Sequence, residues 1–305
     1  MHRRNMLKSA AAVVGAELIA AESAAASTTA PQTSFIETRD RTQLFYKDWG
    51  TGKPVVFVHS WAFNSDMWQY QMNYLAGQDL RCIAYDRRGH GRSSQPGNGY
   101  DYGTLADDLA ALLKHLDLRE VTLVGHSMAG GEIIRYLTRH GSGRISKIVL
   151  LAATLPFPLK TADNPHGVDQ KLFEQLRAAL SKDSPRWFAA GAPGFFGVGV
   201  PGNSVSPEMI QWGLSLCQQT SLKAIIECNR ALAETDFRAE LPKIAVPTLI
   251  IHGDADQSAP LPLTGRKTAA LIPGSQLKVY EGGPHGLFVT HMDRLTADIL
   301  EFVRT

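Results

Sequence analysis

The chain has 305 residues, a formal net charge of +2 and 44% hydrophobic residues. These values are ordinary for a globular protein and far from those of disordered chains or basic nucleic-acid-binding domains, so we expect no nucleic-acid partner. The length allows a single α/β domain that carries an insertion. Outside the first 30 residues, no apolar run approaches the roughly 18 residues that cross a bilayer, so the mature chain should not insert stably into a membrane.

The first 26 residues are typical of an export signal. A basic start that contains Arg3 and Arg4 precedes a weakly apolar Ala/Val/Leu stretch, and three alanines at 24–26 suit signal peptidase. The arginine pair and the residues after it resemble the twin-arginine motif, which directs folded proteins across the membrane. The sequence therefore predicts a twin-arginine-type signal peptide at 1–26, a mature domain at 27–305, and a periplasmic or secreted location.

From Phe35 the chain alternates short β-rich runs with amphipathic stretches. Six of the runs are nearly continuous in β-branched and aliphatic residues, as strands buried on both faces of a parallel sheet should be. With the two opening runs, the predicted strands are Phe35–Thr38, Leu44–Asp48, Val55–Val58, Cys82–Tyr85, Val121–Val124, Ile148–Leu151, Thr248–Ile251 and Leu277–Tyr280. The pattern predicts an α/β fold with a mostly parallel eight-stranded sheet.

Helical periodicity separates many of these strands, which gives the βαβ repetition of a doubly wound sheet. The predicted helices are Leu105–Leu116, Glu132–Arg139, Leu263–Leu271 and Leu287–Val303. The regularity breaks between about 155 and 237, where Pro, Gly and Phe crowd among short helical patterns. Because ligands bind beyond the carboxyl ends of parallel strands, we expect this insertion to form a small helical cap that lines the site. The alternative is a set of surface helices that never reach substrate.

Three cysteines, Cys82, Cys217 and Cys228, fall in none of the close pairs that zinc sites or redox motifs use. Cys82 lies in a predicted strand. Cys217 and Cys228 could pair in an oxidising compartment, but we favour two buried free thiols. The cysteines therefore imply no metal.

The clearest sequence signal of a catalytic residue lies directly after the predicted strand Val121–Val124. Residues 125–130 read Gly-His-Ser-Met-Ala-Gly and precede a helical pattern, which resembles the nucleophile elbow of a strand-turn-helix unit. In that turn the serine is strained and the residues two positions away on either side are small, a demand that Gly125 and Ala129 meet. Ser127 is therefore the predicted nucleophile, and the alternative is a serine at a structural turn.

A serine hydroxyl attacks at neutral pH only when a base takes its proton and a third group orients that base. After such an elbow the expected chain order is Asp or Glu and then His, each just past a strand. His285 lies in a Gly/Pro-rich loop after the last predicted strand and is the predicted base, with His252 as the weaker alternative. Asp254 and Asp256, which follow the preceding strand, compete for the acid role.

A developing alkoxide needs two preorganised N–H donors, and the amide of Met128, directly after the nucleophile, should supply one. The second should come from the loop after the Val55–Val58 strand, which starts at His59. His59 and His126 flank predicted turns and are interpreted as structural or supporting residues.

Residues 85–94 follow the next strand and read Tyr-Asp-Arg-Arg-Gly-His-Gly-Arg-Ser-Ser. We interpret this stretch as a structural turn whose charged residues pair locally. It lacks the pattern of a phosphate-binding P-loop.

Several stretches together resemble the cofactor-free haloperoxidase, aryl esterase and perhydrolase group of the α/β-hydrolase superfamily. They are the elbow with residues 130–136, the Asn-Pro-His-Gly-Val run at 164–168 and the Pro-His-Gly-Leu run at 284–287. The likeness covers nearly all of residues 35–305. It implies the α/β-hydrolase fold, a Ser-Asp-His triad and a small cap over an apolar pocket.

The resemblance also bears on residues that spacing leaves open. Related hydrolases carry Gly-Asp-x-Asp after the same strand and use the later carboxylate, which implies Asp256 as the acid and leaves Asp254 to stabilise the turn. Similar His-Gly-aromatic loops imply the amide of Trp61 as the second oxyanion donor, although Ser60 replaces the common glycine; the alternative is a core aromatic. Ala62 stands where peroxide-using relatives often carry proline, which favours plain hydrolysis.

We therefore expect a serine hydrolase that cleaves a small carboxylic ester or lactone through an acyl-enzyme intermediate, with no metal or cofactor. The alternatives are a cofactor-free haloperoxidase or perhydrolase, an amide or lactam hydrolase, and a hydrolase-fold protein that binds a ligand without turnover. A serine at the elbow argues against haloalkane dehalogenation and epoxide opening. No oligomeric state is predicted.

Overall fold

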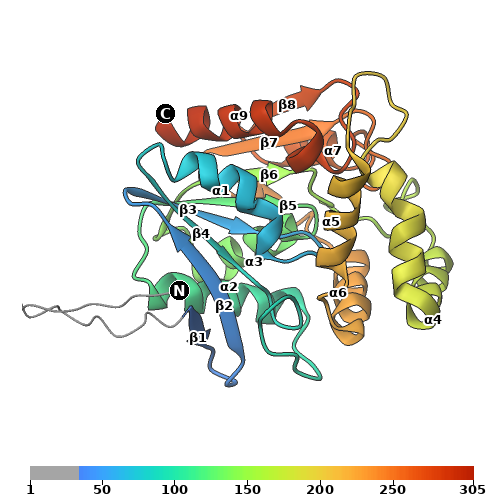
Figure 1. The fold of residues 1–305 in the computed structure, drawn as a ribbon, viewed down its shortest axis with the longest axis horizontal. Helices are drawn as coiled ribbons and strands as arrows, with labels where there is room; N and C mark the ends of the chain where they lie inside the picture. The colour runs from blue at the N-terminus through green and yellow to red at the C-terminus, as the bar shows by residue number, and fades with distance from the viewer. Residues whose placement is uncertain (1–33) are drawn as a thin grey trace, which may run out of the picture. The chain divides into compact units, whose positions relative to one another are not determined.

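The computed structural model describes residues 34–305, and the predicted signal peptide at 1–26 lies outside them. The described residues form an eight-stranded sheet in the order β1-β2-β4-β3-β5-β6-β7-β8 (Figure 1). The strands are β1 (Phe35–Glu37), β2 (Gln43–Trp49), β3 (Lys53–Val58), β4 (Leu80–Tyr85), β5 (Val121–His126), β6 (Ile145–Leu151), β7 (Thr248–Gly253) and β8 (Gln276–Tyr280).

Strand β2 pairs antiparallel with β1 and β4, and every pairing from β4 across to β8 is parallel. The prediction of a mostly parallel eight-stranded sheet is therefore confirmed. The inner strands are apolar along their whole length because both faces of the sheet are covered. In β3, Val56 and Val58 pack into one hydrophobic cluster, and Val55 and Phe57 pack into another on the opposite face.

Helices cover each face of the sheet. On one face, α2 (Tyr102–His115) and α3 (Ala129–His140) pack against each other, and on the other α1 (Gln69–Leu75) packs against α9 (Met292–Arg304) (Figure 1). Helix α7 (Gly265–Leu271) packs against β7 and β8. This arrangement leaves the carboxyl ends of the parallel strands as the edge where loops gather.

Three longer helices fill the segment between β6 and β7, where the sequence predicts an inserted cap. They are α4 (Gln170–Phe195), α5 (Pro207–Cys217) and α6 (Leu222–Glu234). Helix α4 packs against both α5 and α6, and the three stand together beside the carboxyl-terminal edge of the sheet (Figure 1). Side chains of Ser206 and Ser221 cap the first turns of α5 and α6.

The helices differ from the predicted ones in three places. The predicted helix Leu287–Val303 is two helices, α8 (Leu287–Thr290) and α9, because His291 between them lies outside the helical region with φ −126° and ψ 36°. Helix α4 is longer than the short patterns suggest, with a kink at Asp183, whose side chain accepts the amide of Arg186 and so caps the second part. Helix α1 was not predicted, because seven residues are too few to reveal a helical period.

All three cysteines are buried free thiols, as favoured from the sequence. Burial raises the pKa of each thiol to about 12. Within residues 34–305, no helix combines the length and the apolar character that a membrane span requires.

Candidate active site

Ser127 lies in the sharp turn between β5 and α3. Its φ is +57°, in the left-handed region that non-glycine residues rarely adopt. Its amide donates to the carbonyl of Leu151 on the neighbouring strand, which helps to hold the strained turn. A Cβ on Gly125 would lie 2.6 Å from Ile133 Cδ1, and 3.1 Å from the Cβ of Ala129. The predicted need for small residues at this turn is therefore real, and the methyl of Ala129 is accommodated.

The structure brings the three predicted triad residues together by hydrogen bonds. His285 Nε2 lies 2.9 Å from Ser127 Oγ, and His285 Nδ1 lies 2.7 Å from Asp256 Oδ2. All three side chains are buried. They come from loops 29 and 158 residues apart in the chain that meet at the carboxyl ends of β5, β7 and β8.

The carboxylate of Asp256 is held on both oxygens. Oδ1 accepts the amides of Ser258 and Ala259 at 2.9 and 2.8 Å, which leaves Oδ2 for the imidazole of His285. Burial opposes ionisation, but the rings of His285 and His252 outweigh it and hold the pKa of this carboxyl well below its usual range. Asp256 is therefore an anion whose Oδ2 orients the imidazole of His285.

The two alternatives from the sequence have other partners. Asp254 is exposed, and its carboxylate accepts the amide of Gly282 at 2.7 Å, which joins the turns after β7 and β8. His252 Nε2 lies 2.7 Å from the carbonyl of Ala259 and 3.3 Å from Asp256 Oδ2, so this ring contacts the acid and not the serine.

Both predicted oxyanion donors are available. Neither the amide of Met128 nor that of Trp61 has a hydrogen-bond acceptor among residues 34–305. The indole of Trp61 donates to the carbonyl of Ile225 at 2.9 Å and packs against Trp187 and Phe188 of α4, so its side chain forms a wall of the pocket. The following residue, Ala62, has φ +61°, which a proline cannot adopt.

His126, which the sequence leaves as a structural or supporting residue, lies directly behind the base. Its Nε2 is 2.9 Å from the carbonyl oxygen of His285, and the two rings meet edge-on with centroids 4.8 Å apart. Burial lowers the pKa of His126 to about 3, so the ring is neutral and donates from Nε2. Its position next to the nucleophile is the one sequence signal of this role.

A pocket of about 340 Å³ opens over Ser127 and His285. Its wall is largely aromatic, and α4 contributes much of it through Phe173, Trp187, Phe188 and Phe195. The ring of Phe195 lies edge-on to the imidazole of His285, with centroids 5.2 Å apart. The pocket therefore offers an apolar surface next to the hydroxyl–imidazole pair.

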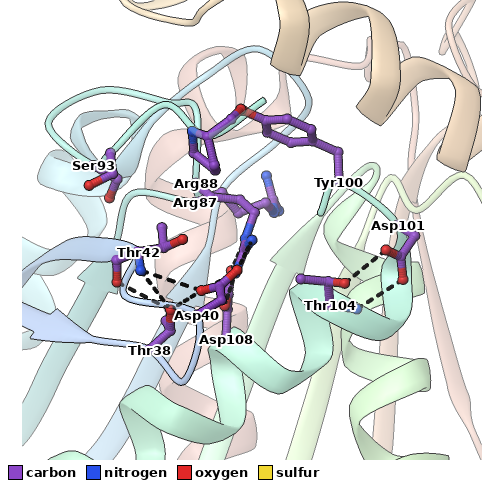
Figure 2. A network of polar contacts seen from close by, with 12 residues as sticks. Thr38, Asp40, Thr42, Arg87, Arg88, Ser93, Tyr100, Asp101, Thr104 and Asp108 are labelled. Carbon is purple, nitrogen blue, oxygen red and sulfur yellow. Dashed lines mark hydrogen bonds and ion pairs between the residues drawn. The ribbon is translucent and has the colours of Figure 1, made fainter. Parts of the chain in front are cut away.

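The charged turn at 85–94 pairs locally in part, since Arg92 contacts Asp86 at 3.3 Å, but its other two arginines pair with distant residues. Arg88 Nε and Nη2 contact the carboxylate of Asp108 on α2, and its Nη1 lies 2.8 Å from Asp40, as Figure 2 shows. Arg87 contacts Glu132 on α3. Within residues 34–305, no group of three or more His, Cys, Asp or Glu side chains could hold a metal ion.

Comparison with known proteins agrees with this geometry. Residues 53–191 match the family model described as alpha/beta hydrolase fold. The chain is 44% identical over 270 residues to the non-heme chloroperoxidase CPO-A1 of Kitasatospora aureofaciens, a match that covers 87% of this chain and 98% of that protein.

Two further relatives are named as esterases. The bifunctional esterase/perhydrolase DCH of Acinetobacter calcoaceticus is 37% identical over 89% of this chain and 99% of its own length. The solved structure of the esterase EaEST from Exiguobacterium antarcticum superposes with a TM-score of 0.85 at 34% identity, covering 89% of this chain and 99% of that one. This chain therefore belongs to the α/β-hydrolase family of enzymes, in the group that contains non-heme haloperoxidases and esterases.

Proposed function

We propose that the protein is a serine hydrolase that cleaves small carboxylic esters or lactones through an acyl-enzyme intermediate. The observation that carries this proposal is the hydrogen-bonded series from Ser127 through His285 to Asp256, buried beneath an aromatic pocket. A hydroxyl, a base and an oriented acid in this order are what nucleophilic acyl transfer requires.

In the first step, Ser127 Oγ attacks the carbonyl carbon of the substrate while His285 Nε2 takes its proton. The anionic Asp256 stabilises the resulting imidazolium, and the free amides of Met128 and Trp61 hold the oxyanion. His285 then gives the proton to the leaving alcohol as the C–O bond breaks. In the second step, His285 deprotonates a water that attacks the acyl-enzyme, and the acid leaves as Ser127 regains its proton.

The pocket supports a small and largely apolar substrate. A volume of about 340 Å³ is near the lower end of ligand-binding cavities. Two similar proteins carry the word esterase in their names, which favours the same class of substrate here.

A second candidate is the peroxide-using activity for which the haloperoxidase relatives are named. Hydrogen peroxide would replace water in the second step, so that the acyl-enzyme releases a peracid, which can oxidise halide. We rank this activity below hydrolysis because Ala62 replaces the proline expected of peroxide-using relatives. Bromination of monochlorodimedone in acetate and peroxide measures it, and a rate above that of ester hydrolysis would reverse the ranking.

Labelling with a fluorophosphonate, followed by peptide mapping, tests the main proposal. We expect one adduct, on Ser127, and hydrolysis of p-nitrophenyl esters that falls at least about 10⁴-fold in Ser127→Ala. A folded wild-type protein that is neither labelled nor active on an ester, lactone and amide panel would instead favour a protein that binds ligands without turnover.

Export is a separate proposal that rests on residues 1–26 alone. Replacing Arg3 and Arg4 with lysine should keep the precursor in the cytoplasm, as fractionation and immunoblotting would reveal. Normal export of this variant would contradict the twin-arginine route.

A further inference from the structure

We propose that Arg87, together with His59 and Glu132, is a positioning device that aims the amide of Trp61 at the oxyanion. The inference rests on the proposed acyl-transfer function. It concerns a stretch of sequence, residues 85–94, that the triad chemistry does not use.

The argument starts from one peptide group. The carbonyl of Ser60 and the amide of Trp61 belong to the same trans peptide, so they point in opposite directions. His59 Nδ1 lies 2.7 Å from the Ser60 oxygen, and Arg87 Nη1 lies 3.3 Å from it. Holding this carbonyl toward the protein interior therefore directs the Trp61 N–H away from it, toward the pocket.

The protonation of His59 follows from the contact at its other ring nitrogen, Nε2. The backbone amide of Arg87 donates to Nε2 of His59 at 2.9 Å, so the proton of the neutral ring is on Nδ1, where it can bond the Ser60 oxygen. Burial, with the adjacent Arg87 charge, holds the pKa of this histidine well below its usual range. Arg87 Nη2 also donates to the carbonyl of His59, so two successive carbonyls of the loop are fixed by one guanidinium.

The same guanidinium reaches the helix behind the nucleophile. Arg87 Nε pairs with Glu132 Oε2, and the hydroxyl of Tyr85 donates to the other oxygen of Glu132. Glu132 lies in the first turn of α3, which begins directly after Met128. The ion pair thus ties the loop that carries one oxyanion donor to the helix that follows the other.

A gain in stability does not by itself explain why the Arg87–Glu132 ion pair is buried. Arg87 and Glu132 are both 0% exposed, and the cost of removing two charges from water often exceeds their mutual attraction, so an apolar pair of similar volume can be as stable. What an apolar pair cannot do is bond the carbonyls of His59 and Ser60. Fixed donors aimed at the oxyanion are where hydrolases gain much of their rate.

The neighbouring ion pair supplies a matched control. Arg88 and Asp108 are 1% and 2% exposed and lie in the same region of the fold. Their further polar partner is Asp40, which Thr38 and Thr42 also bond (Figure 2). Within the described part of the chain, the side chain of Arg88 makes no hydrogen bond or ion pair with the loop at 59–61.

The experiment compares Arg87→Met/Glu132→Leu with Arg88→Met/Asp108→Leu. For each variant, kcat and KM on a p-nitrophenyl ester, the inhibition constant of a trifluoromethyl ketone and the thermal midpoint Tm are measured. In the first variant we expect kcat to fall about 10²-fold, KM to stay within about threefold, and inhibition by the ketone, which forms an oxyanion, to weaken in parallel. In the control, kcat should stay within about threefold whatever its Tm.

A folded Arg87→Met/Glu132→Leu variant that keeps the wild-type kcat would overturn the positioning role, as would equal kcat losses in the two variants. If that variant does not fold, Arg87→Lys is used, because lysine retains the charge opposite Glu132 but not the fork that reaches both carbonyls. A loss of about tenfold in kcat supports the role, and kcat within twofold of wild type overturns it. A wild-type protein that cleaves no ester would refute the proposed function itself.

We also infer that a second cavity beside the pocket binds a carboxylate at the far end of the acyl chain. This cavity has a volume of about 120 Å³ and shares Thr154, Phe173, Leu232 and Ser258 with the pocket over Ser127. A substrate that fills both would be an ester or lactone whose acyl part ends in a negative charge.

The charge of Lys267 carries this inference. This half-buried lysine of α7 lines the cavity together with His166, and it has no acidic partner among residues 34–305. Its one hydrogen bond goes to the side-chain oxygen of the buried Asn164 at 3.4 Å. A half-buried ammonium whose one hydrogen bond is long and goes to a neutral oxygen would form a stronger hydrogen bond with a carboxylate.

The test uses two esters of equal chain length, the p-nitrophenyl monoester of glutaric acid and p-nitrophenyl pentanoate. In Lys267→Met, the ratio of their kcat/KM values should fall about tenfold in disfavour of the anionic ester, and it should not change in Lys114→Met, which removes an exposed lysine of α2. Binding of glutarate, measured by calorimetry, tests the site without requiring turnover. We expect it to be weaker in Lys267→Met than in the wild type. An unchanged ratio and unchanged glutarate binding would overturn the inference.

Discussion

The Nε2 atom of His126 lies 2.9 Å from the carbonyl oxygen of His285, so the residue before the nucleophile holds the backbone of the base. The bond is a donation from a neutral ring, since burial lowers the pKa of His126 to about 3. His285 also receives the ring of Phe195 edge-on, and the amide of Gly286, the next residue, donates to the Phe195 carbonyl at 2.8 Å. The loop that carries the base is thus fixed from the elbow and from α4.

We expect His126→Phe to lower kcat by about tenfold or more, because it removes the imidazole donor from the carbonyl of His285, which keeps only the amide of Leu287, and frees the loop to shift. His126→Gln, which keeps an N–H donor, should retain most of the activity. Steady-state kinetics and Tm for the pair decide the matter. Equal activity in the two variants would mean that the hydrogen bond does not position the base.

Replacement of the two aspartates after β7 should have very different effects. Asp256→Asn should lower kcat by about 10⁴-fold, because an amide cannot hold the imidazole of His285 in the required tautomer. Asp254→Asn should cost less than about tenfold, because its oxygen can still accept the amide of Gly282. Kinetics on one p-nitrophenyl ester suffice, and losses of similar size would assign the acid role to neither residue alone.

The sheet could be predicted because each buried strand appears in the sequence as a short run of apolar residues. Strands with both faces covered need apolar residues at every position, and runs such as Val121–Val124 and Ile148–Leu151 satisfy that condition. The ends of the strands could not be predicted. Strand β5 continues to His126 and β7 to Gly253 through backbone hydrogen bonds that the type of side chain does not reveal.

The meeting of Ser127, Asp256 and His285 could also be anticipated, since each follows a strand and parallel strands end at one edge. The residues that support the triad and the oxyanion loop, such as Arg87 and Glu132, could not be predicted. Arg87 pairs with Glu132, 45 residues away, and such a partnership depends on how α3 packs against the sheet. No local pattern encodes it, which is why residues 85–94 read as a self-contained turn in the sequence.

A proline at position 62 should harm the protein rather than create a peroxide-using enzyme. The φ of Ala62 is +61°, whereas proline is fixed near −65°, so Ala62→Pro must rebuild the loop that carries the Trp61 amide. We expect a loss of about 3 kcal/mol in the free energy of unfolding in urea and no gain in monochlorodimedone bromination. Ala62→Gly, which fits a positive φ, should keep kcat within about threefold. A stable Ala62→Pro variant with faster bromination would contradict this prediction.

Buried histidines should make the protein lose stability in mild acid. Burial, with the charge of Arg87, lowers the pKa of His90 to about 3, and His59 and His126 are shifted in the same direction. Between the unfolded value of 6.5 and these folded values, the unfolded chain binds protons that the native protein does not. Stability is therefore fully present above pH 6.5 and falls as the pH is lowered, by up to about 1.4 kcal/mol per pH unit for each such histidine.

His90→Gln isolates one of these contributions. In the wild type, His90 Nδ1 bonds the carbonyl of Arg88 at 2.8 Å, and His90 Nε2 has no partner among residues 34–305. Glutamine can therefore replace the donor without adding a titrating group. The slope of the unfolding free energy against pH, from urea titrations between pH 6 and 4.5, should decrease by about 1 kcal/mol per unit relative to wild type. The exposed His115→Gln should leave the slope unchanged. An unaltered slope in His90→Gln would mean that the native protein binds a proton at His90 as readily as the unfolded chain does, and that burial does not keep this ring neutral.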